Sequence, residues 1–217
     1  KDTGYRPPPQ LLPRIAPTEQ DDKWRKRLLR GEVHDENAFA LGGIAPHAGL
    51  FGSAPDLARF AQLLLNGGVY DHKRLVSRAT VERFTRRAGV PSSSRALGWD
   101  TPSEGSSAGT VLSARSFGHT GFTGTSMWMD PERKLFVILL SNRVHPSREN
   151  NAIREVRRAV ADAARMLKVG DAKAVLAGGM EAMSQAPFVL RGDLRSGLKL
   201  GAGKLEDSLM QGLYDTQ

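Results

Sequence analysis

The sequence predicts an α+β fold: an antiparallel sheet of three or more strands flanked by helices, with a short helix-strand-loop tail. Three successive strands are expected at residues 116–123, 125–129 and 134–140, because aromatic, Thr, Met and aliphatic residues dominate there. Asp130-Pro131-Glu132-Arg133 has the composition of a type I turn between the last two. Residues 135–140 are continuously apolar instead of alternating, which predicts a strand buried on both faces.

Two helices are expected before the sheet. Ser53-Ala54-Pro55-Asp56 resembles a capping box ahead of an apolar periodicity, and Asn66-Gly67-Gly68 would end that helix. A second helix is expected from about Ser77, with Val81 and Phe84 facing inward.

A long amphipathic helix is expected after the sheet, from Arg148 to a stop at Gly170. Its apolar positions recur every three or four residues, at Ile153, Val156, Val160, Ala163 or Ala164, and Leu167. Such a stripe should pack across the sheet.

Two stretches are predicted to be irregular. Residues 6–22 are rich in proline and should be an extended, wrapping segment. Residues 91–110 are rich in Ser, Gly and Pro and include Gly105-Ser106-Ser107-Ala108-Gly109, a formal Gly-x-Ser-x-Gly. A nucleophile elbow must follow a strand and open a helix, whereas this one lies in a polar loop, so we expect no nucleophile there.

Composition limits the classes of function. The chain has 217 residues and no cysteine, which excludes disulfides, zinc-thiolate sites and a cysteine nucleophile but does not predict a compartment. Most of the excess positive charge behind the net +8 lies in residues 23–30, 83–87 and 154–158, which have acids beside or among them, such as Asp22, Glu82 and Glu155, and no aromatic platform accompanies them. We expect solvated helix faces and no nucleic-acid partner, with a weak phosphate-binding patch as the alternative.

Membrane and metal partners are not expected either. No apolar run approaches the 18 residues of a membrane span, and the chain does not open on a signal peptide. His34-Asp35-Glu36-Asn37 groups metal-capable side chains, but adjacent residues converge poorly on one ion. A loop with local backbone hydrogen bonds is the expectation, with no metal and no cofactor.

The stretch Gly118-His119-Thr120-Gly121-Phe122-Thr123-Gly124 resembles the third conserved box of the penicillin-recognising serine hydrolases. The likeness extends over about residues 1–160 and includes Ala45 to Phe51, Trp128, Asp130-Pro131 and Leu139 to Arg143. These enzymes are serine β-lactamases, D-amino-acid peptidases and esterases. The resemblance implies that His119 and Thr120 contact the substrate carboxylate or a proton relay, and that the N–H of Phe122 is an oxyanion donor. Gly121 would let the ligand approach the backbone closely.

The resemblance also implies a Ser-x-x-Lys nucleophile and a Tyr-x-Asn or Ser-x-Asn box, which would lie upstream of residue 1. This sequence contains no Tyr-x-Asn and no Ser-x-Asn. Its single Ser-x-x-Lys, Ser196 to Lys199, contains a glycine that disfavours the helix which the motif needs. We therefore assign no catalytic residue and expect the chain to be inactive alone.

Residues 161–217 resemble a second family, the thiolases, which are acyl-CoA acyltransferases. The likeness covers Leu167 to Pro187, with Ala-Gly-Gly-Met-Glu-Ala-Met-Ser at its centre, and then Leu205 to Ser208 and Gly212 to Asp215. A buried strand is expected at residues 174–177, followed by the two glycines Gly178 and Gly179 and an irregular segment. Because a thiolase nucleophile is a cysteine, no catalytic role is assigned to Glu181 or Ser184.

The expected organisation is therefore a chimera of two partial domains, a β-lactamase-like one at residues 1–160 and a thiolase-like fragment at 161–217. Three hypotheses follow. The chain is the latter part of a serine hydrolase acting on an ester, β-lactam or D-amino-acid amide, or it is an acyltransferase remnant, or it is a non-catalytic binding module. A small-molecule substrate and self-association through an open sheet edge are the partners considered.

Overall fold

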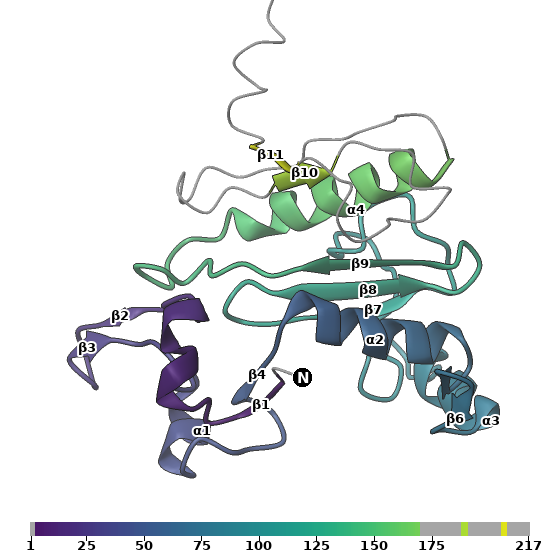
Figure 1. The fold of residues 1–217 in the computed structure, drawn as a ribbon. Helices are drawn as coiled ribbons and strands as arrows, with labels where there is room; N and C mark the ends of the chain where they lie inside the picture. The colour runs from purple at the N-terminus through teal and green to yellow at the C-terminus, as the bar shows by residue number, and fades with distance from the viewer. Residues whose placement is uncertain (1–2, 170–187, 191–204, 208–217) are drawn as a thin grey trace, which may run out of the picture.

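A three-stranded antiparallel sheet forms the centre of the fold. The computed structural model describes residues 3–169, 188–190 and 205–207. Strands β7 (Phe117–Thr120), β8 (Ser126–Asp130) and β9 (Leu135–Leu139) follow one another in the order β7-β8-β9. The predicted α+β class and the three successive strands are confirmed, although β7 ends three residues earlier than expected. Figure 1 shows the sheet between helices α2 (Ala54–Leu65) and α4 (Ile153–Val169).

The register of the sheet decides which residues face each helix. Phe117 lies opposite Met129, and Met129 lies opposite Phe136, so the three form one row across one face. Phe117 and Met129 are buried with Ala61 of α2, and Leu64 and Leu65 pack against them. This row fixes α2 to the sheet.

Trp128 points to the opposite face, the one covered by α4, because adjacent side chains of a strand alternate. A Cβ on its cross-strand neighbour Gly118 would lie 2.4 Å from the Trp128 ring, so only glycine fits there. The indole Nε1 donates a hydrogen bond of 3.1 Å to Ser107 Oγ in the loop before β7. Trp128 therefore joins the sheet to that loop.

Helix α4 begins at Ile153, five residues later than predicted. The Arg148 N–H donates to the Glu19 carboxylate at 3.1 Å, and Asn150 Oδ1 accepts from the Ala152 N–H at 2.9 Å. One long-range bond and one local bond thus engage the residues just before the helix. Gly170 and the strand predicted at 174–177 lie outside the described residues.

Strand β9 contacts α2 on one face and α4 on the other, but neither face is fully buried, which differs from the prediction. All of its five residues are half-buried. The strand is at the edge of the sheet, and no other strand among the described residues pairs with its outer side. A continuous apolar run therefore marks an edge strand here.

The two predicted early helices exist, but their details differ from the prediction. Ser53 is the N-cap residue of α2 but makes no side-chain capping bond, and the Asp56 carboxylate accepts a hydrogen bond from Thr3 Oγ1 at 3.0 Å and pairs with Arg59 instead of reaching back to Ser53. In α3 (Arg78–Thr85) Ser77 does cap, through the Thr80 N–H. Val81 is buried as predicted, whereas Phe84 is 48% exposed, because this peripheral helix buries a single narrow stripe.

The segment before these helices is more structured than the prediction of an extended chain. It contains a 3-10 helix, η1 (Pro9–Arg14), and the helix α1 (Glu36–Ala40) follows it. Four two-stranded antiparallel pairs complete the described structure: β1 (Gly4–Tyr5) with β4 (Leu50–Phe51), β2 (Gln20–Asp21) with β3 (Arg27–Leu28), β5 (Val69–Tyr70) with β6 (Lys73–Arg74), and β10 (Phe188–Leu190) with β11 (Leu205–Asp207).

The predicted turn between β8 and β9 is present and is organised by a buried carboxylate. Asp130 is fully buried and accepts hydrogen bonds from the N–H groups of Glu132 and Arg133, and from the backbone and side chain of Ser113. Burial by itself would raise the pKa of Asp130, but these bonds, with one from the Arg133 guanidinium, lower it. The charged carboxylate thus holds the turn and the start of β7 together.

None of the helices in the described part of the chain combines the length and the apolar character needed to cross a membrane.

Candidate functional site

The outer edge of β7 is only partly covered. Gly118 exchanges two backbone hydrogen bonds with Asp100, of 2.7 and 3.0 Å. Because hydrogen-bonding directions alternate along a strand, the N–H and C=O of Thr120 point to the same side as those of Gly118. No strand among the described residues pairs with Thr120 there. The edge is therefore open where the predicted site begins.

The predicted site residues His119, Thr120, Gly121 and Phe122 run from β7 into a tight turn. The Gly121 N–H donates to the Thr125 carbonyl at 2.8 Å, and the Gly124 N–H donates to the Gly121 carbonyl at 3.2 Å. His119 is exposed, and its Nδ1 is 2.9 Å from the Thr120 carbonyl oxygen. Among the described residues we find no acceptor for the Phe122 N–H.

Two arginines hold this turn by donating hydrogen bonds to its carbonyl groups. Arg143 Nε donates to the Phe122 carbonyl at 2.7 Å, and its Nη1 donates to the carbonyls of Arg148 and Asn150. Arg157 Nη2, from α4, donates to the carbonyls of Gly121 and Thr125 at 2.9 and 2.8 Å. The conformation of the turn is thus set by guanidinium groups on two separate segments.

Arg157, which holds this turn, is a buried cation. It is 8% exposed, pairs with no carboxylate in the described part of the chain, and leaves its Nε without a hydrogen-bond partner there. Burial, and then the charge of the nearby Arg143, lower the pKa of Arg157. A buried charge without a counter-ion is costly, so the two carbonyl bonds are its principal compensation.

A side chain at residue 121 would collide with another residue of the same turn. A Cβ at this position would lie 2.2 Å from Thr125 Oγ1. The prediction that this glycine admits a ligand is not tested by this contact. The contact disfavours a side chain at this position unless Thr125 changes its rotamer, whether or not a ligand binds.

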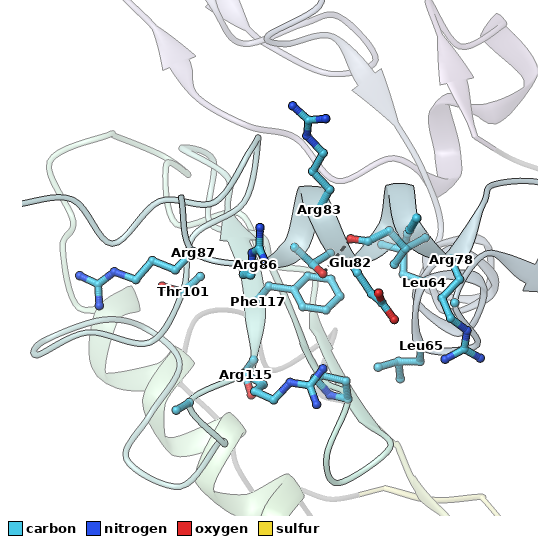
Figure 2. Close-up of a pocket in the computed structure, with 17 residues that line it drawn as sticks. Leu64, Leu65, Arg78, Glu82, Arg83, Arg86, Arg87, Thr101, Arg115 and Phe117 are labelled. Carbon is cyan, nitrogen blue, oxygen red and sulfur yellow. Dashed lines mark hydrogen bonds between the residues drawn. The ribbon is translucent and has the colours of Figure 1, made fainter. Parts of the chain in front are cut away.

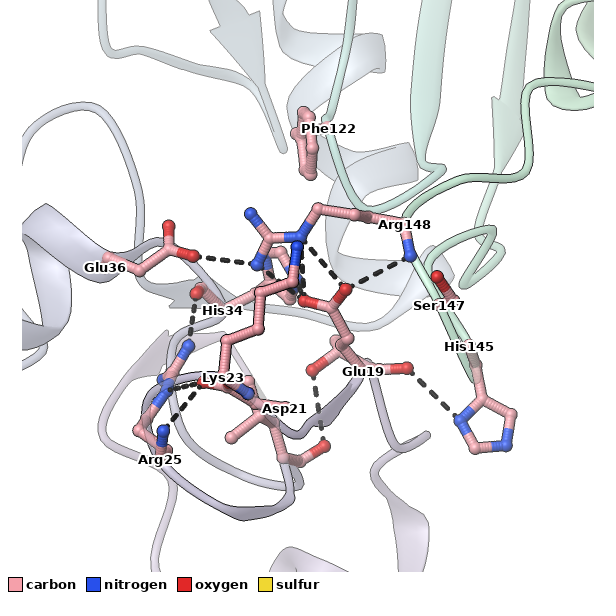
Figure 3. Close-up of polar contacts among 12 residues, drawn as sticks. Glu19, Asp21, Lys23, Arg25, His34, Glu36, Phe122, His145, Ser147 and Arg148 are labelled. Atoms are coloured by element: carbon pink, nitrogen blue, oxygen red, sulfur yellow. Dashed lines mark hydrogen bonds and ion pairs between the residues drawn. The ribbon is translucent and has the colours of Figure 1, made fainter.

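A polar cluster missed by sequence reasoning lies next to Phe122 (Figure 3). Its members are Glu19, His34, Glu36 and Arg148. The exposed Phe122 ring stacks on His34 with centroids 5.6 Å apart, and the Arg148 Cζ is 6.0 Å from its centroid.

Glu19 is the centre of this cluster. The Arg148 side chain contacts both of its carboxylate oxygens at 2.6 to 3.0 Å, and His34 Nε2 lies 2.9 Å from Oε2. Hydrogen bonds from Arg148, opposed by burial and supplemented by His34, lower the pKa of Glu19 to about 2 from a usual value of 4.5. The same contacts, with Glu36, raise the pKa of Arg148.

The cluster ties two distant segments together. Around it, the Gln20 N–H donates to the Pro146 carbonyl at 2.9 Å, and Asn142 Nδ2 donates to the Pro17 carbonyl at 2.8 Å. Residues 17–20 are therefore fixed beside residues 142–148. Because His34 and Arg148 both lie against the Phe122 ring, the cluster also supports the predicted site.

The motif at residues 34–37 separates in the structure. His34 and Glu36 join the cluster, while Asp35 caps α1 by accepting from the Ala38 N–H at 2.8 Å. The predicted local backbone bond is confirmed for Asp35, although the segment opens a helix and is not a loop. Within the described ranges, no three His, Asp or Glu side chains are grouped as a metal would need.

The Gly-x-Ser-x-Gly motif is not part of this site. Residues 105–109 form an irregular loop, as predicted, in which Ser107 Oγ accepts the Trp128 bond and Ser106 Oγ lies 3.4 Å from two backbone nitrogens. Ser196 lies outside the described residues.

The match of residues 1–162 to a family of serine hydrolases identifies this arrangement, a sheet between two helices with an open strand edge running into a braced turn, as a serine-hydrolase-like region. The sequence model of the β-lactamase family matches residues 1–162, and the chain belongs to this family.

Curated relatives support the same grouping. Proteins described as putative D-alanyl-D-alanine carboxypeptidases from Salmonella typhi, Salmonella paratyphi B and Salmonella newport are each 39% identical over 125 residues. The match covers 56% of this chain and 29% of each relative. The chain therefore corresponds to under a third of these proteins.

The model of the thiolase N-terminal domain matches residues 141–217. It overlaps the first match at residues 141–162, which include the start of α4. The predicted boundary between residues 160 and 161 lies inside this continuous helix and stays a prediction.

We expect Gly121→Ala to destabilise the protein, by about 1 to 3 kcal/mol, because the new methyl group collides with Thr125 Oγ1. The double variant Gly121→Ala/Thr125→Ala should recover most of this loss, since the colliding atom is absent. Chemical denaturation of the four proteins of this cycle measures the coupling. Additive losses would show that the collision is not the cause.

We expect Glu19→Gln to lower the free energy of unfolding by on the order of 2 to 3 kcal/mol at pH 7. Since folding depresses the pKa of Glu19 to about 2, its contribution is complete above pH 4.5 and is lost as the pH falls from there toward 2. The variant should therefore lose less stability than wild type over that range. Denaturant titrations at several pH values test this, with exposed Glu149→Gln as the control. An unchanged pH profile in Glu19→Gln would contradict the assignment.

Proposed function

We propose that residues 1–162 are the substrate-holding part of a serine hydrolase acting on a D-amino-acid amide, β-lactam or ester. The observation that carries the proposal is the open β7 edge continuing into the Phe122 turn. An extended substrate can add to such an edge through its own backbone groups. The names of the Salmonella relatives favour a substrate ending in D-alanine.

In this proposal each residue at the edge has a separate role. The outward backbone of Thr120 pairs with the substrate, and the Phe122 N–H supplies one oxyanion donor. His119 contacts the substrate carboxylate or a proton relay. Arg143 and Arg157 act through the turn, because they hold the carbonyls on either side of the Phe122 N–H.

We further propose that the 217-residue chain does not catalyse turnover alone. It has no cysteine and no Tyr-x-Asn or Ser-x-Asn, and its single Ser-x-x-Lys contains a glycine. An acyl transfer without an activated nucleophile loses its covalent route. The second candidate is that residues 141–217 are a remnant of a thiolase, favoured by the second family match, although the chain has no cysteine to act as the nucleophile of that family.

The test combines binding with turnover. We expect acetyl-D-alanyl-D-alanine to shift the backbone amide resonances of Thr120 and Phe122. We expect the chain to convert a chromogenic β-lactam, an aryl ester, and acetoacetyl-CoA with CoA no faster than buffer alone does. The L,L dipeptide is the matched ligand control. Turnover that Ser196→Ala abolishes would overturn the proposal of inactivity, and equal shifts with both dipeptides would overturn the substrate assignment.

We also propose self-association through the edge of β9. Its apolar residues are half-buried, and no described strand covers its outer side. Antiparallel pairing of two copies about Val137 would place Lys134 opposite Leu140, so no like charges meet. The pairing would make one continuous six-stranded sheet from two three-stranded ones.

Sedimentation velocity over a range of concentrations should show a reversible dimer. Leu140→Lys should weaken it at least about tenfold, because a second charge then faces Lys134 of the other copy. Leu41→Lys, at a residue that is 68% exposed and remote from the sheet, is the control and should leave it unchanged. A monomer at all concentrations, or equal weakening by both variants, would contradict this interface.

A further inference from the structure

A cavity of about 820 Å³ lies at the other end of β7 from the Phe122 turn. Phe117, the first residue of the strand, lines it, together with the end of α2, helix α3 and the loop before β7 (Figure 2). Its volume is within the range of small-molecule sites in proteins. The cavity shares no lining residue with the edge from Thr120 to Phe122.

The floor of this cavity is apolar. Leu64 and Leu65 come from α2, Val81 from α3 and Phe117 from β7. Phe117 and Val81 are almost fully buried and belong to the core, so the apolar surface that a ligand can reach is presented by the half-buried Leu64 and Leu65. A ligand lying on this floor would therefore contact rigid apolar side chains.

The rim of the cavity is strongly basic. Glu82 is the single acid among the lining residues, whereas five arginines line it: Arg78, Arg83, Arg86, Arg87 and Arg115. Arg87 donates to the Ser93 carbonyl at 3.0 Å. The side chains of the other four make no hydrogen bond or ion pair with any described residue. Such a rim holds an excess positive charge over an apolar floor.

Arg86 and Arg115 come from separate segments. Arg86 is the C-cap residue of α3, and Arg115 precedes β7. Figure 2 shows the two on either side of the Phe117 ring in this view, whereas the guanidinium groups of Arg83 and Arg87 extend away from it. Two guanidinium groups from different elements can contact one multiply charged group together.

We propose that this cavity binds a small organic phosphate: an apolar body against Leu64 and Leu65 on the floor and a phosphate group held by Arg86 and Arg115. Guanidinium groups match the geometry and the charge of phosphate oxygens. The apolar floor distinguishes such a ligand from inorganic phosphate, which could not use it. The site is independent of the hydrolase function proposed for the opposite end of β7.

The test is calorimetric titration of the 217-residue chain at fixed ionic strength with phenyl phosphate, inorganic phosphate and benzyl alcohol. Phenyl phosphate should bind at least about tenfold more tightly than either of the others, because it alone uses both floor and rim. Equal affinity for phenyl phosphate and inorganic phosphate, or no binding of phenyl phosphate at millimolar concentration, would overturn the proposal.

Matched charge variants locate the site. Arg86→Gln/Arg115→Gln should weaken phenyl phosphate at least about tenfold. Arg30→Gln/Arg154→Gln removes the same charge from exposed residues that do not line the cavity and should leave the affinity within about twofold. Equal weakening in both pairs would show attraction by net charge alone and would contradict a built site.

A second measurement on the wild-type chain does not depend on the variants folding. Phenylglyoxal modifies accessible arginines, and peptide mass spectrometry reports each position. Phenyl phosphate should protect Arg86 and Arg115 but not Arg30 and Arg154. Uniform protection, or none, would overturn the assignment of these two arginines.

Discussion

The cross-strand register of β7, β8 and β9 is the constraint on which the rest of this structure depends. It aligns Phe117, Met129 and Phe136 beneath α2 and turns Trp128 toward α4. A shift by one residue would exchange these two faces and bury the wrong side chains against both helices. The same register directs the backbone groups of Thr120 away from β8. The hydrophobic core and the open edge are therefore consequences of one pairing.

Several buried charges lie around the turn after β7. Glu19 and Arg148 form a hydrogen-bonded pair that fixes the N-terminal segment beside residues 142–148. Among the described residues, Arg157 is compensated by carbonyl oxygens alone. Breaking any such contact leaves a charge in a poorly hydrated place, so the turn is held more rigidly than its exposure suggests. This rigidity suits a site that must present a backbone N–H in one direction.

Membership of the β-lactamase family and catalytic competence are separate questions for this chain. The match at residues 1–162 shows the family, whereas the chain spans 29% of the Salmonella relatives. An oxyanion donor contributes to acyl transfer only when a nucleophile attacks beside it. The function proposed for the β7 edge is accordingly that of a binding surface.

The sequence by itself determined the three successive strands, the existence of the flanking helices and both family resemblances, because these depend on local periodicity, turn chemistry and motifs. Only the tertiary structure decided that β9 is a half-buried edge strand, that Ser53 does not cap α2 and that α4 begins at Ile153. It also revealed the Glu19–Arg148 pair, 129 residues apart, and the basic rim around Phe117. Contacts between distant segments leave no periodic signal in a single sequence, since their energy depends on which surfaces the folded chain brings together.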